Sequence, residues 1–425
     1  MSSLTSPVET KESFQLAATA QWGRSEQSLI QAQSCVFPTP LTRSWRWVAW
    51  TLALLIPGLF YLGPALLLVP PFLYPYAPNA AILVLVLDIV LLILPIDRPW
   101  PALRVLFQLW YEPFSVRHNL ANASLADALA KEELSIYAMH PHGVIPVHAF
   151  LWAAFCHQYM PHAYGVGSTT NAALRLPILR HVLGWLSTVS ASRAVLYKVM
   201  TNHNHPRSLF ILPGGVAEIF MAHPGRHALL ARSRRGLMKL ALQTGASLVP
   251  VYVFGANDLY HQLGTSPAPN QSETQSTTDN DGSAGASTLK NGDKKRPSFS
   301  ISSLQERLSR TAQAGFTIFW GQYGTPMPFQ VPLTIVLGDP IPPEVTTNNG
   351  LPTNNDTKRS SDAGQPTMPP SPTKLEKHAK YPPVENPTNE QVDNLLERYI
   401  DAHQRLFQQY KEFAGCPSHA TLEVL

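Results

Sequence analysis

The chain has 425 residues, which is room for one large domain or two ordinary ones. Hydrophobic residues make up 45% of it and charged residues 14%, well below the roughly one quarter of a typical soluble domain, so the composition indicates contact with a membrane. The net charge of +4 is too small to indicate a nucleic-acid-binding protein, although it suits an anionic membrane surface or a phosphate-bearing ligand.

The N-terminal region combines a polar tail, residues 1–40, expected to be disordered, with a strongly apolar stretch. Trp47–Val69 carries no charge and is long enough to cross a hydrocarbon core roughly 30 Å thick. A second apolar run, Ala80–Leu94, is slightly short and is interrupted only by Asp88, which favours a shallow segment. Residues 45–96 are therefore predicted to form a transmembrane or re-entrant hairpin.

Basic residues flank this hairpin on its outer sides, at Arg43 and Arg46 before it and at Arg98 and Arg104 after it. The positive-inside rule then places both ends in the cytosol and predicts a cytosolic domain over residues 100–425. A cleaved signal peptide fits poorly, because the apolar run begins after residue 40 and is too long. A buried core helix stays an alternative, since proline and glycine interrupt the first run.

From Ser135 onward, short apolar runs alternate with helical patterns such as Arg235–Gln243. The strand-like runs are Ser135–Met139, Ser208–Leu212, Leu248–Phe254 and Leu333–Leu337. This alternation predicts an α/β fold with a largely buried sheet. Asn389–Phe413 has apolar residues at helical spacing, which predicts an amphipathic helix docked on the core or on the membrane surface.

Two kinds of feature are predicted to carry no chemistry. Residues 265–300 and 345–378 are rich in small and polar residues with almost nothing to bury, which predicts disordered insertions in loops. Cys35, Cys156 and Cys416 lie far apart and form no C-x-x-C pair, which indicates free thiols in a reducing compartment without a disulfide framework or a cysteine metal site.

The stretch Tyr137–Gly143 reads YAMHPHG and places His140 and His142 on either side of a proline. Proline is excluded from a helix interior and favours an extended residue before it, so the pair lies at a strand end or on the loop that leaves it. Residues two apart in an extended segment face the same way, so both imidazoles should lie on one side. Strand ends of α/β sheets are where functional sites gather.

This histidine pair has three alternative roles, namely metal binding, proton transfer and packing. A metal would need further ligands, for which the stretch NHNHP offers His203 and His205, but carboxylates at ligand-like spacing are missing. A loop of this composition is an unusual place to bury histidine for packing alone. Proton transfer is favoured, because histidine titrates near neutral pH and is the usual general base.

Leu212–Glu218 reads LPGGVAE, in which a strand-like run enters a Gly-Gly turn and then a helical pattern. Gly214 and Gly215 permit close backbone approach, and N–H groups at a helix start can hold an anion or a developing oxyanion. Such turns are also common without a function. Glu218 is either a ligand-binding carboxylate or a favourable charge in the first helical turn.

Four basic groups cluster ahead of a helical pattern in the stretch RSRRGLMK at Arg232–Lys239. They form either a solvated helix face or a clamp for the phosphates of a ligand such as coenzyme A. The basic residues that could extend such a clamp are Arg175, Arg180 and Arg193.

Together these stretches resemble the diacylglycerol acyltransferase type 2 family, which also includes monoacylglycerol acyltransferases and wax-ester synthases. YAMHPHG is similar to the family's HPHG block, LPGGVAE to its glycine-rich block, and Arg232–Asp258 to its long basic signature. Gly338–Ile341 and the final helix match in the same order, over residues 45–262 and 315–425 in all. Leu237 and Ala256 replace the family's phenylalanine and glutamate, which leaves the acyl and acceptor preference open.

The resemblance implies a glycerolipid-acyltransferase-like sheet-and-helix domain that makes triacylglycerol from diacylglycerol and acyl-CoA. It implies a place in the endoplasmic reticulum membrane, with the catalytic domain in the cytosol, and on lipid droplets. Its partners would be acyl-CoA, diacylglycerol or another lipid alcohol, and the membrane, with a homo-oligomer left open. Acyl-CoA is a substrate, so neither a cofactor nor a metal is expected.

The resemblance also implies roles for the residues of these blocks. His142 is expected to be the general base and His140 to orient it, with Glu218 in the catalytic group. The residues expected to bind acyl-CoA or the oxyanion are Gly143, Gly214, Gly215, Arg234, Arg235 and Lys239.

Three alternatives stay open at this point. The nearest has the same chemistry on monoacylglycerol or on a fatty alcohol. A metal-dependent membrane hydrolase would use His140, His142, His203 and His205, and a non-catalytic lipid-droplet protein would keep only the fold.

Overall fold

The computed structural model describes residues 41–96, 98–120, 122–132, 134–160, 165–202, 207–263, 315, 317–343 and 380–425. The expected tail at residues 1–40 lies outside these ranges, as do the expected insertions at residues 265–300 and 345–378. His203, His205 and Cys35 also lie outside them. Cys156 and Cys416 are free thiols, as expected.

A mixed sheet forms the centre of the molecule, and seven of its strands lie within the described ranges, in the order β1-β10-β7-β2-β5-β3-β4. The strands are β1 (Arg117–His118), β2 (Ser135–His140), β3 (Val166–Thr169), β4 (Thr188–Ser190), β5 (Leu209–Ile211), β7 (Ser247–Phe254) and β10 (Thr334–Leu337). From β7 to β4 every neighbouring pair is parallel, whereas β10 runs antiparallel to β7. The predicted α/β fold class and its four strand-like runs are confirmed. The carboxyl ends of the parallel strands meet at one edge of the sheet.

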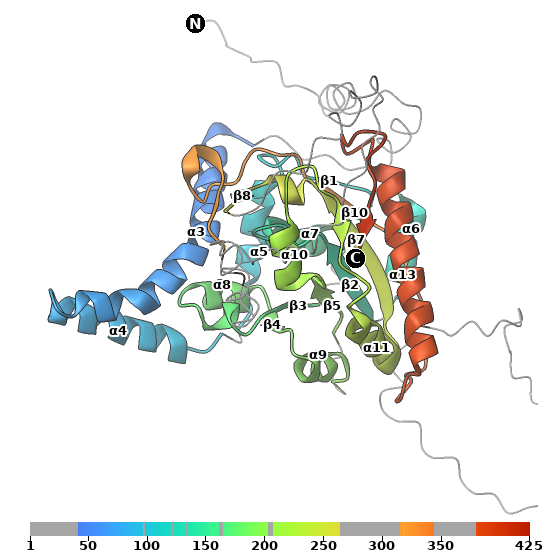
Figure 1. Cartoon of the computed structure of the whole chain (residues 1–425), viewed down its shortest axis with the longest axis horizontal. Helices are drawn as coiled ribbons and strands as arrows, with labels where there is room; N and C mark the ends of the chain where they lie inside the picture. The colour runs from blue at the N-terminus through green and yellow to red at the C-terminus, as the bar shows by residue number, and fades with distance from the viewer. Residues whose placement is uncertain are drawn as a thin grey trace, which may run out of the picture.

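Alternation along β2 sorts side chains to the two faces of the sheet. Tyr137 and Met139 pack in one core with α5 (Pro101–Phe107) and α7 (Val147–Tyr159). Ile136 and Ala138 pack in another with α11 (Arg235–Thr244) and α13 (Asn389–Tyr410). Figure 1 shows α11 and α13 on one side of the sheet and α5, α7 and α10 on the other. The predicted amphipathic helix therefore docks on the core.

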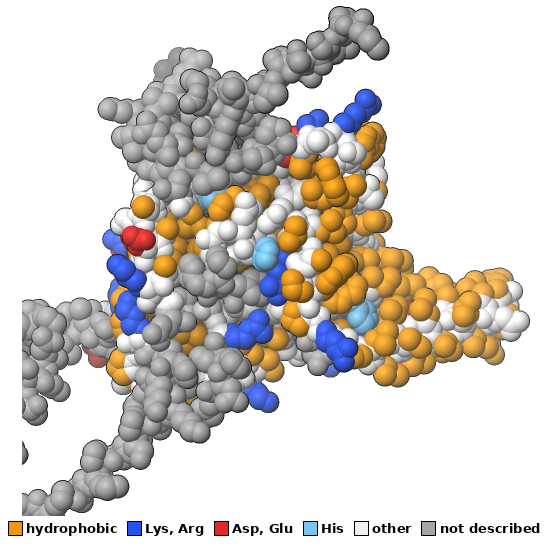
Figure 2. Space-filling view, turned by 180° about the vertical axis from the view of Figure 1, so that it is seen from behind, with side chains coloured by type: hydrophobic (Ala, Val, Ile, Leu, Met, Phe, Trp, Pro, Cys, Tyr) orange, Lys and Arg blue, Asp and Glu red, His pale blue; other side chains and the backbone are white. Residues whose placement is uncertain are grey.

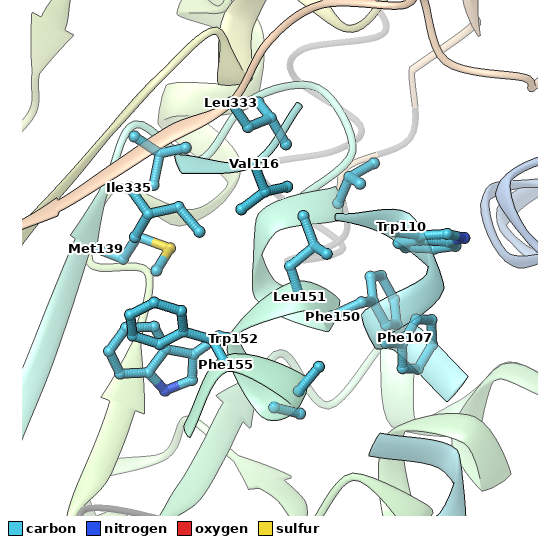
Figure 3. Packing of buried hydrophobic residues seen from close by; sticks show 14 of the residues in the cluster. Phe107, Trp110, Val116, Met139, Phe150, Leu151, Trp152, Phe155, Leu333 and Ile335 are labelled. Carbon is cyan, nitrogen blue, oxygen red and sulfur yellow. The ribbon is translucent and has the colours of Figure 1, made fainter. Parts of the chain in front are cut away.

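The first of these cores is rich in aromatic side chains (Figure 3). Phe107, Trp110 and Phe150 meet edge-on or tilted, with ring centroids 4.8 to 6.4 Å apart. Such pairs add to the free energy of apolar burial, which is itself about 25 cal/mol per Å². This layer fixes α7, the helix that follows the HPHG stretch.

The remaining elements of the domain, within the described residues, are short. The helices are α6 (Ala123–Ala130), α8 (Leu179–Trp185), α9 (Arg193–Met200) and α10 (Gly215–Met221), with short 3₁₀ turns η1 (Gln108–Trp110), η3 (Ala173–Arg175), η4 (Ala256–Asp258) and η5 (Gln322–Gly324). Two small ladders pair β6 (Ala228–Leu229) with β11 (Glu423–Val424), and β8 (His261–Gln262) with β9 (Phe319–Trp320).

Two apolar helices, α3 (Arg43–Leu73) and α4 (Pro78–Ile93), form an arm that projects from the domain (Figure 1). Ala49 and Ala53 of α3 are buried against the domain, whereas hydrophobic side chains cover the projecting part (Figure 2). By length and composition, α3 is the one helix of the described residues that could cross a membrane, and α4 is shorter. The two helices pack against each other in the predicted order, and their place in a membrane stays a prediction. Asp88 is buried, and neither of its carboxylate oxygens has a hydrogen-bond partner within the described residues.

The end of α4 is tied to the domain by α8. The Arg180 guanidinium donates to the carbonyl oxygens of Leu91 at 2.7 Å and Leu94 at 3.2 Å, and His181 donates to Leu91 at 2.9 Å. These contacts satisfy carbonyl groups that a helix end leaves unpaired. Arg180 therefore holds the arm in place, and this structure gives it a task other than the suggested phosphate clamp.

Candidate active site

His140 ends β2 with its side chain fully buried and both ring nitrogens occupied. Nδ1 lies 2.6 Å from Oε1 of Glu218, and Nε2 lies 2.9 Å from the hydroxyl of Tyr399 on α13. The carboxylate accepts from Nδ1, while Nε2 accepts from the hydroxyl in a neutral ring and donates to it in a protonated one. In either state no nitrogen is left for a substrate.

Glu218 is the hub that joins two of the sequence blocks. Its Oε1 also accepts the backbone N–H of Leu230 at 3.0 Å, and its Oε2 accepts that of His142 at 2.8 Å. Burial alone would raise the pKa of Glu218, but the His140 imidazole and these hydrogen bonds hold that pKa below its usual value. The carboxylate is thus ionised and ties α10 to the end of β2.

His142 differs from His140 in both its contacts and its surroundings. Its Nδ1 lies 3.0 Å from the carbonyl oxygen of Gly143, and because a carbonyl only accepts, Nδ1 carries the hydrogen. In the neutral ring Nε2 is then an acceptor, and it has no hydrogen-bond partner in the part of the chain that the structure describes. Burial lowers the pKa of His142, so the ring is neutral at pH 7.

A cavity of about 660 Å³ opens beside His142 at the carboxyl edge of the sheet. His142 lines it and His140 does not. Most of its wall is apolar, with contributions from α3, α7, α8, β5 and β9. The polar residues Ser168, Thr169 and Thr188 line another part of the wall. The volume and the mainly apolar wall with a few polar groups are typical of a site for an amphiphilic ligand.

The i, i+2 spacing predicted that the two histidines lie on one side of the segment. This prediction was wrong. The extended segment ends at His140, whose ring follows Ile136 and Ala138 toward α13, and the chain then turns at Gly143 with a φ of +67°. The turn directs His142 to the cavity. This arrangement makes His142 the only one of the two with a ring nitrogen available for proton transfer.

Comparison with known proteins agrees with the sequence blocks. Residues 102–280 match the diacylglycerol acyltransferase family. The chain is 26% identical over 300 residues to diacylglycerol O-acyltransferase 2-like protein 6 of Bos taurus, covering 68% of this chain and 70% of that protein. It is 28% identical over 293 residues to 2-acylglycerol O-acyltransferase 1 of Mus musculus, covering 68% of each chain.

A third relative is diacylglycerol O-acyltransferase 2 of Homo sapiens, 25% identical over 300 residues that cover 68% of this chain and 60% of that protein. No solved structure matches the chain significantly. These matches agree with the resemblance of the sequence blocks to the diacylglycerol acyltransferase family. The match and the acyltransferase relatives support an acyltransferase enzyme, as the resemblance implied. The names of its relatives include both diacylglycerol and 2-acylglycerol enzymes.

Different structural features explain why each of these positions in the acyltransferase blocks is a glycine. A side-chain carbon at Gly214 would lie 1.8 Å from the Glu218 carboxyl carbon, and one at Gly143 would lie 2.8 Å from the carbonyl oxygen of Ala256. Both positions therefore exclude a side chain. Gly215 has a φ of +53° and lines the cavity at the start of α10. Of the three predicted oxyanion glycines, Gly215 alone lies on the cavity wall.

Two residues of the predicted acyl-CoA cluster make contacts within the fold. Arg234 donates to the carbonyl of Gly214 at 2.9 Å, behind Glu218. Arg235 forms an ion pair with Asp393 of α13 and a hydrogen bond to Asn389. Neither they nor Lys239 line the cavity. Their role in binding acyl-CoA stays a prediction.

Among the described residues, no group of three or more His, Cys, Asp or Glu side chains is placed to hold a metal ion. His140 and His142 face different surroundings, so they do not form a ligand pair. His203 and His205, which the hydrolase alternative requires, lie outside the described ranges.

Two residues of this site were not found from the sequence. In the sequence, Tyr399 is only one of the apolar positions of an amphipathic helix. Its hydroxyl contacts His140, which lies 259 positions away in the chain. His403, one helical turn further on, is also buried, and its ring lies 5.3 Å from that of His140. Long-range pairs of this kind leave no local signal in a single sequence.

Proposed function

We propose that this acyltransferase transfers an acyl group from acyl-CoA to the free hydroxyl of diacylglycerol, which gives triacylglycerol and coenzyme A. The observation that carries the proposal is the placement of His142, which lines an apolar cavity with Nε2 free of protein hydrogen bonds in the described part of the chain. The sequence blocks and the named relatives supply the reaction class.

His142 acts as the general base in this reaction. Its Nε2 takes the proton of the acceptor hydroxyl while that oxygen attacks the thioester carbonyl carbon. The C–S bond then breaks, coenzyme A leaves as a thiolate, and the thiolate recovers the proton from His142. The lowered pKa of His142 supports this role, because the ring must be neutral to accept a proton.

Glu218, His140 and Tyr399 position the base without touching the substrate. Glu218 holds the backbone N–H of His142, His140 holds Glu218, and Tyr399 holds His140. The start of α10 at Gly215, on the cavity wall, is the candidate site for backbone stabilisation of the tetrahedral oxyanion.

The apolar arm supports an enzyme that works at a membrane. Both substrates are amphiphiles, and α3 contributes to the cavity wall and to the exposed apolar surface of the arm. We place the enzyme in the endoplasmic reticulum membrane and on lipid droplets, with the catalytic domain in the cytosol. Monoacylglycerol is the second candidate acceptor, which the 2-acylglycerol relatives favour.

Acyl transfer on isolated membranes tests this function. Labelled oleoyl-CoA is offered with diacylglycerol, monoacylglycerol or a long-chain alcohol in separate reactions, with and without a chelator. Labelled triacylglycerol that is lost in the His140→Ala/His142→Ala double variant supports the proposal. Diacylglycerol or wax ester as the main product moves the proposal to another acceptor, chelator-sensitive hydrolysis favours the metal-dependent alternative, and no transfer to any acceptor overturns the enzymatic function.

A further inference from the structure

The apolar helix α3 forms part of the cavity as well as part of the arm. Phe60, Tyr61 and Pro64 line the cavity beside His142. Beyond them, the α3 side chains Leu67, Leu68 and Phe72 are exposed. Cavity and exposed apolar surface thus meet within a few residues of one helix.

Tyr61 fastens this part of α3 to β9. Its hydroxyl accepts the backbone N–H of Phe319 at 2.7 Å and donates to the carbonyl oxygen of the same residue. The two rings also stack, with centroids 4.7 Å apart and planes 20° from parallel. A tyrosine that satisfies both backbone groups of one strand residue is a specific contact, beyond what apolar packing requires.

The opposite side of α3 is closed by a close approach at Gly63. A side-chain carbon there would lie 3.0 Å from Cβ of Leu176, a residue that also lines the cavity. The helix therefore stands between Leu176 on one side and Phe319 on the other. Two contacts of different kinds fix its distance from the cavity.

We propose that Tyr61 is a specificity-determining residue of the lipid-binding cavity. It holds α3 against β9, so that α3 becomes a wall along which the acyl chains of the bound acyl-CoA and of the lipid acceptor lie. This inference rests on the proposed function and assigns to the membrane helix a part in choosing the lipid, in addition to anchorage. The chemical class that such a wall recognises is a long hydrocarbon chain.

The substitution Tyr61→Phe tests the inference because it removes the hydroxyl and keeps the ring stack. The backbone N–H and C=O of Phe319 lose their partner, so the wall becomes loose while His142 keeps its contacts. We expect KM for the lipid acceptor to rise about tenfold and kcat to stay within about twofold. The kcat/KM ratio of lauroyl-CoA to oleoyl-CoA should also shift about fivefold or more.

Tyr74→Phe is the matched control, since Tyr74 immediately follows α3 and is exposed. It should leave both the acceptor KM and the chain-length ratio unchanged. Gly63→Ala is a second test, because the added carbon displaces α3 from Leu176 and should alter the same ratio. Unchanged KM and chain-length ratio in both Tyr61→Phe and Gly63→Ala would overturn the inference.

A binding measurement separates this inference from the proposed reaction. Membranes that hold the full chain are irradiated with a diazirine-bearing oleoyl-CoA, and labelled peptides are mapped by mass spectrometry. Labelling of the peptide that contains Phe60–Pro64, competed by unlabelled oleoyl-CoA, supports the wall even if turnover fails. Labelling at His142 without labelling of α3 would overturn the wall while leaving the proposed function intact.

Discussion

The Glu218 carboxylate lies 2.6 Å from Nδ1 of His140, and both side chains are shielded from solvent. The same carboxylate accepts the backbone N–H of His142. The buried pair thus fixes the loop that presents His142. The pair contributes more to the position of this loop than to the free energy of unfolding, because desolvation offsets much of the attraction within a buried pair.

Gly214→Ala should disable the enzyme through Glu218. The new methyl group would overlap the carboxyl carbon at 1.8 Å, so Glu218 must leave His140 and His142. We expect acyl transfer to fall at least about 100-fold, in line with the loss of a positioned general base. Gly236→Ala is the control, because nothing lies within 4 Å of its added carbon and it should retain normal activity. Normal transfer by Gly214→Ala would contradict the role of Glu218.

Tyr399→Phe should reduce kcat without a matching change in KM. The variant leaves Nε2 of His140 buried without its partner, at a cost of about 1–3 kcal/mol, and removes the contact that holds the ring in place. We expect kcat to fall about tenfold while KM stays within about twofold. Tyr323→Phe, at a side chain that is 91% exposed, is the matched control. A lower melting temperature with an unchanged kcat would reduce Tyr399 to a structural residue.

Acid should destabilise the fold through buried histidines. Burial lowers the pKa values of His118, His148 and His403 from 6.5 to about 3. Between those pH values the unfolded chain binds protons that the folded chain excludes, so stability is full above pH 6.5 and falls as the pH drops toward 3. Each residue contributes roughly 1 kcal/mol per pH unit in that window.

Thermal unfolding in detergent at a series of pH values checks this prediction. His148 has no hydrogen-bond partner on either nitrogen within the described residues. His148→Leu removes one of the three titrating rings, so the melting temperature should fall less steeply as the pH drops. A melting temperature that is constant from pH 7 to pH 4 would show that these rings titrate normally.

Arg235→Ala should leave the KM for acyl-CoA within about twofold. The Arg235 charge is already paired with Asp393 on α13, and exposed pairs of this kind contribute at most about 1 kcal/mol to stability. Asp393→Ala should therefore lower the free energy of unfolding by at most about 1 kcal/mol, which is a small decrease in melting temperature. A tenfold rise in KM for acyl-CoA in Arg235→Ala alone would restore the phosphate clamp that the sequence suggested.

The sequence predicted those parts of the structure that depend on local periodicity. The buried strands around Tyr137 and Val249 and the final amphipathic helix are such parts, because apolar spacing determines which face each side chain takes. The side-by-side histidines were predicted wrongly, since the pattern does not reveal that β2 ends at His140 and that the chain turns at Gly143.

The contacts that the sequence does not reveal join partners that are distant in the chain. Arg235 reads as a free cation until α13 supplies Asp393, and Tyr61 reads as one more apolar residue until β9 supplies the backbone of Phe319. Neither partner can be paired with its residue by composition or spacing. Tertiary contacts over more than a hundred residues decide both roles.

The most direct test of the account compares acyl transfer by the wild-type chain, His142→Gln and His419→Gln, in membranes that contain equal amounts of each protein. His419 is exposed and serves as the control. With His142 as the general base, His142→Gln should lose about 100- to 10,000-fold in kcat and keep its melting temperature, while His419→Gln behaves as wild type. A His142→Gln enzyme within about threefold of the wild-type kcat would contradict the assignment of the base.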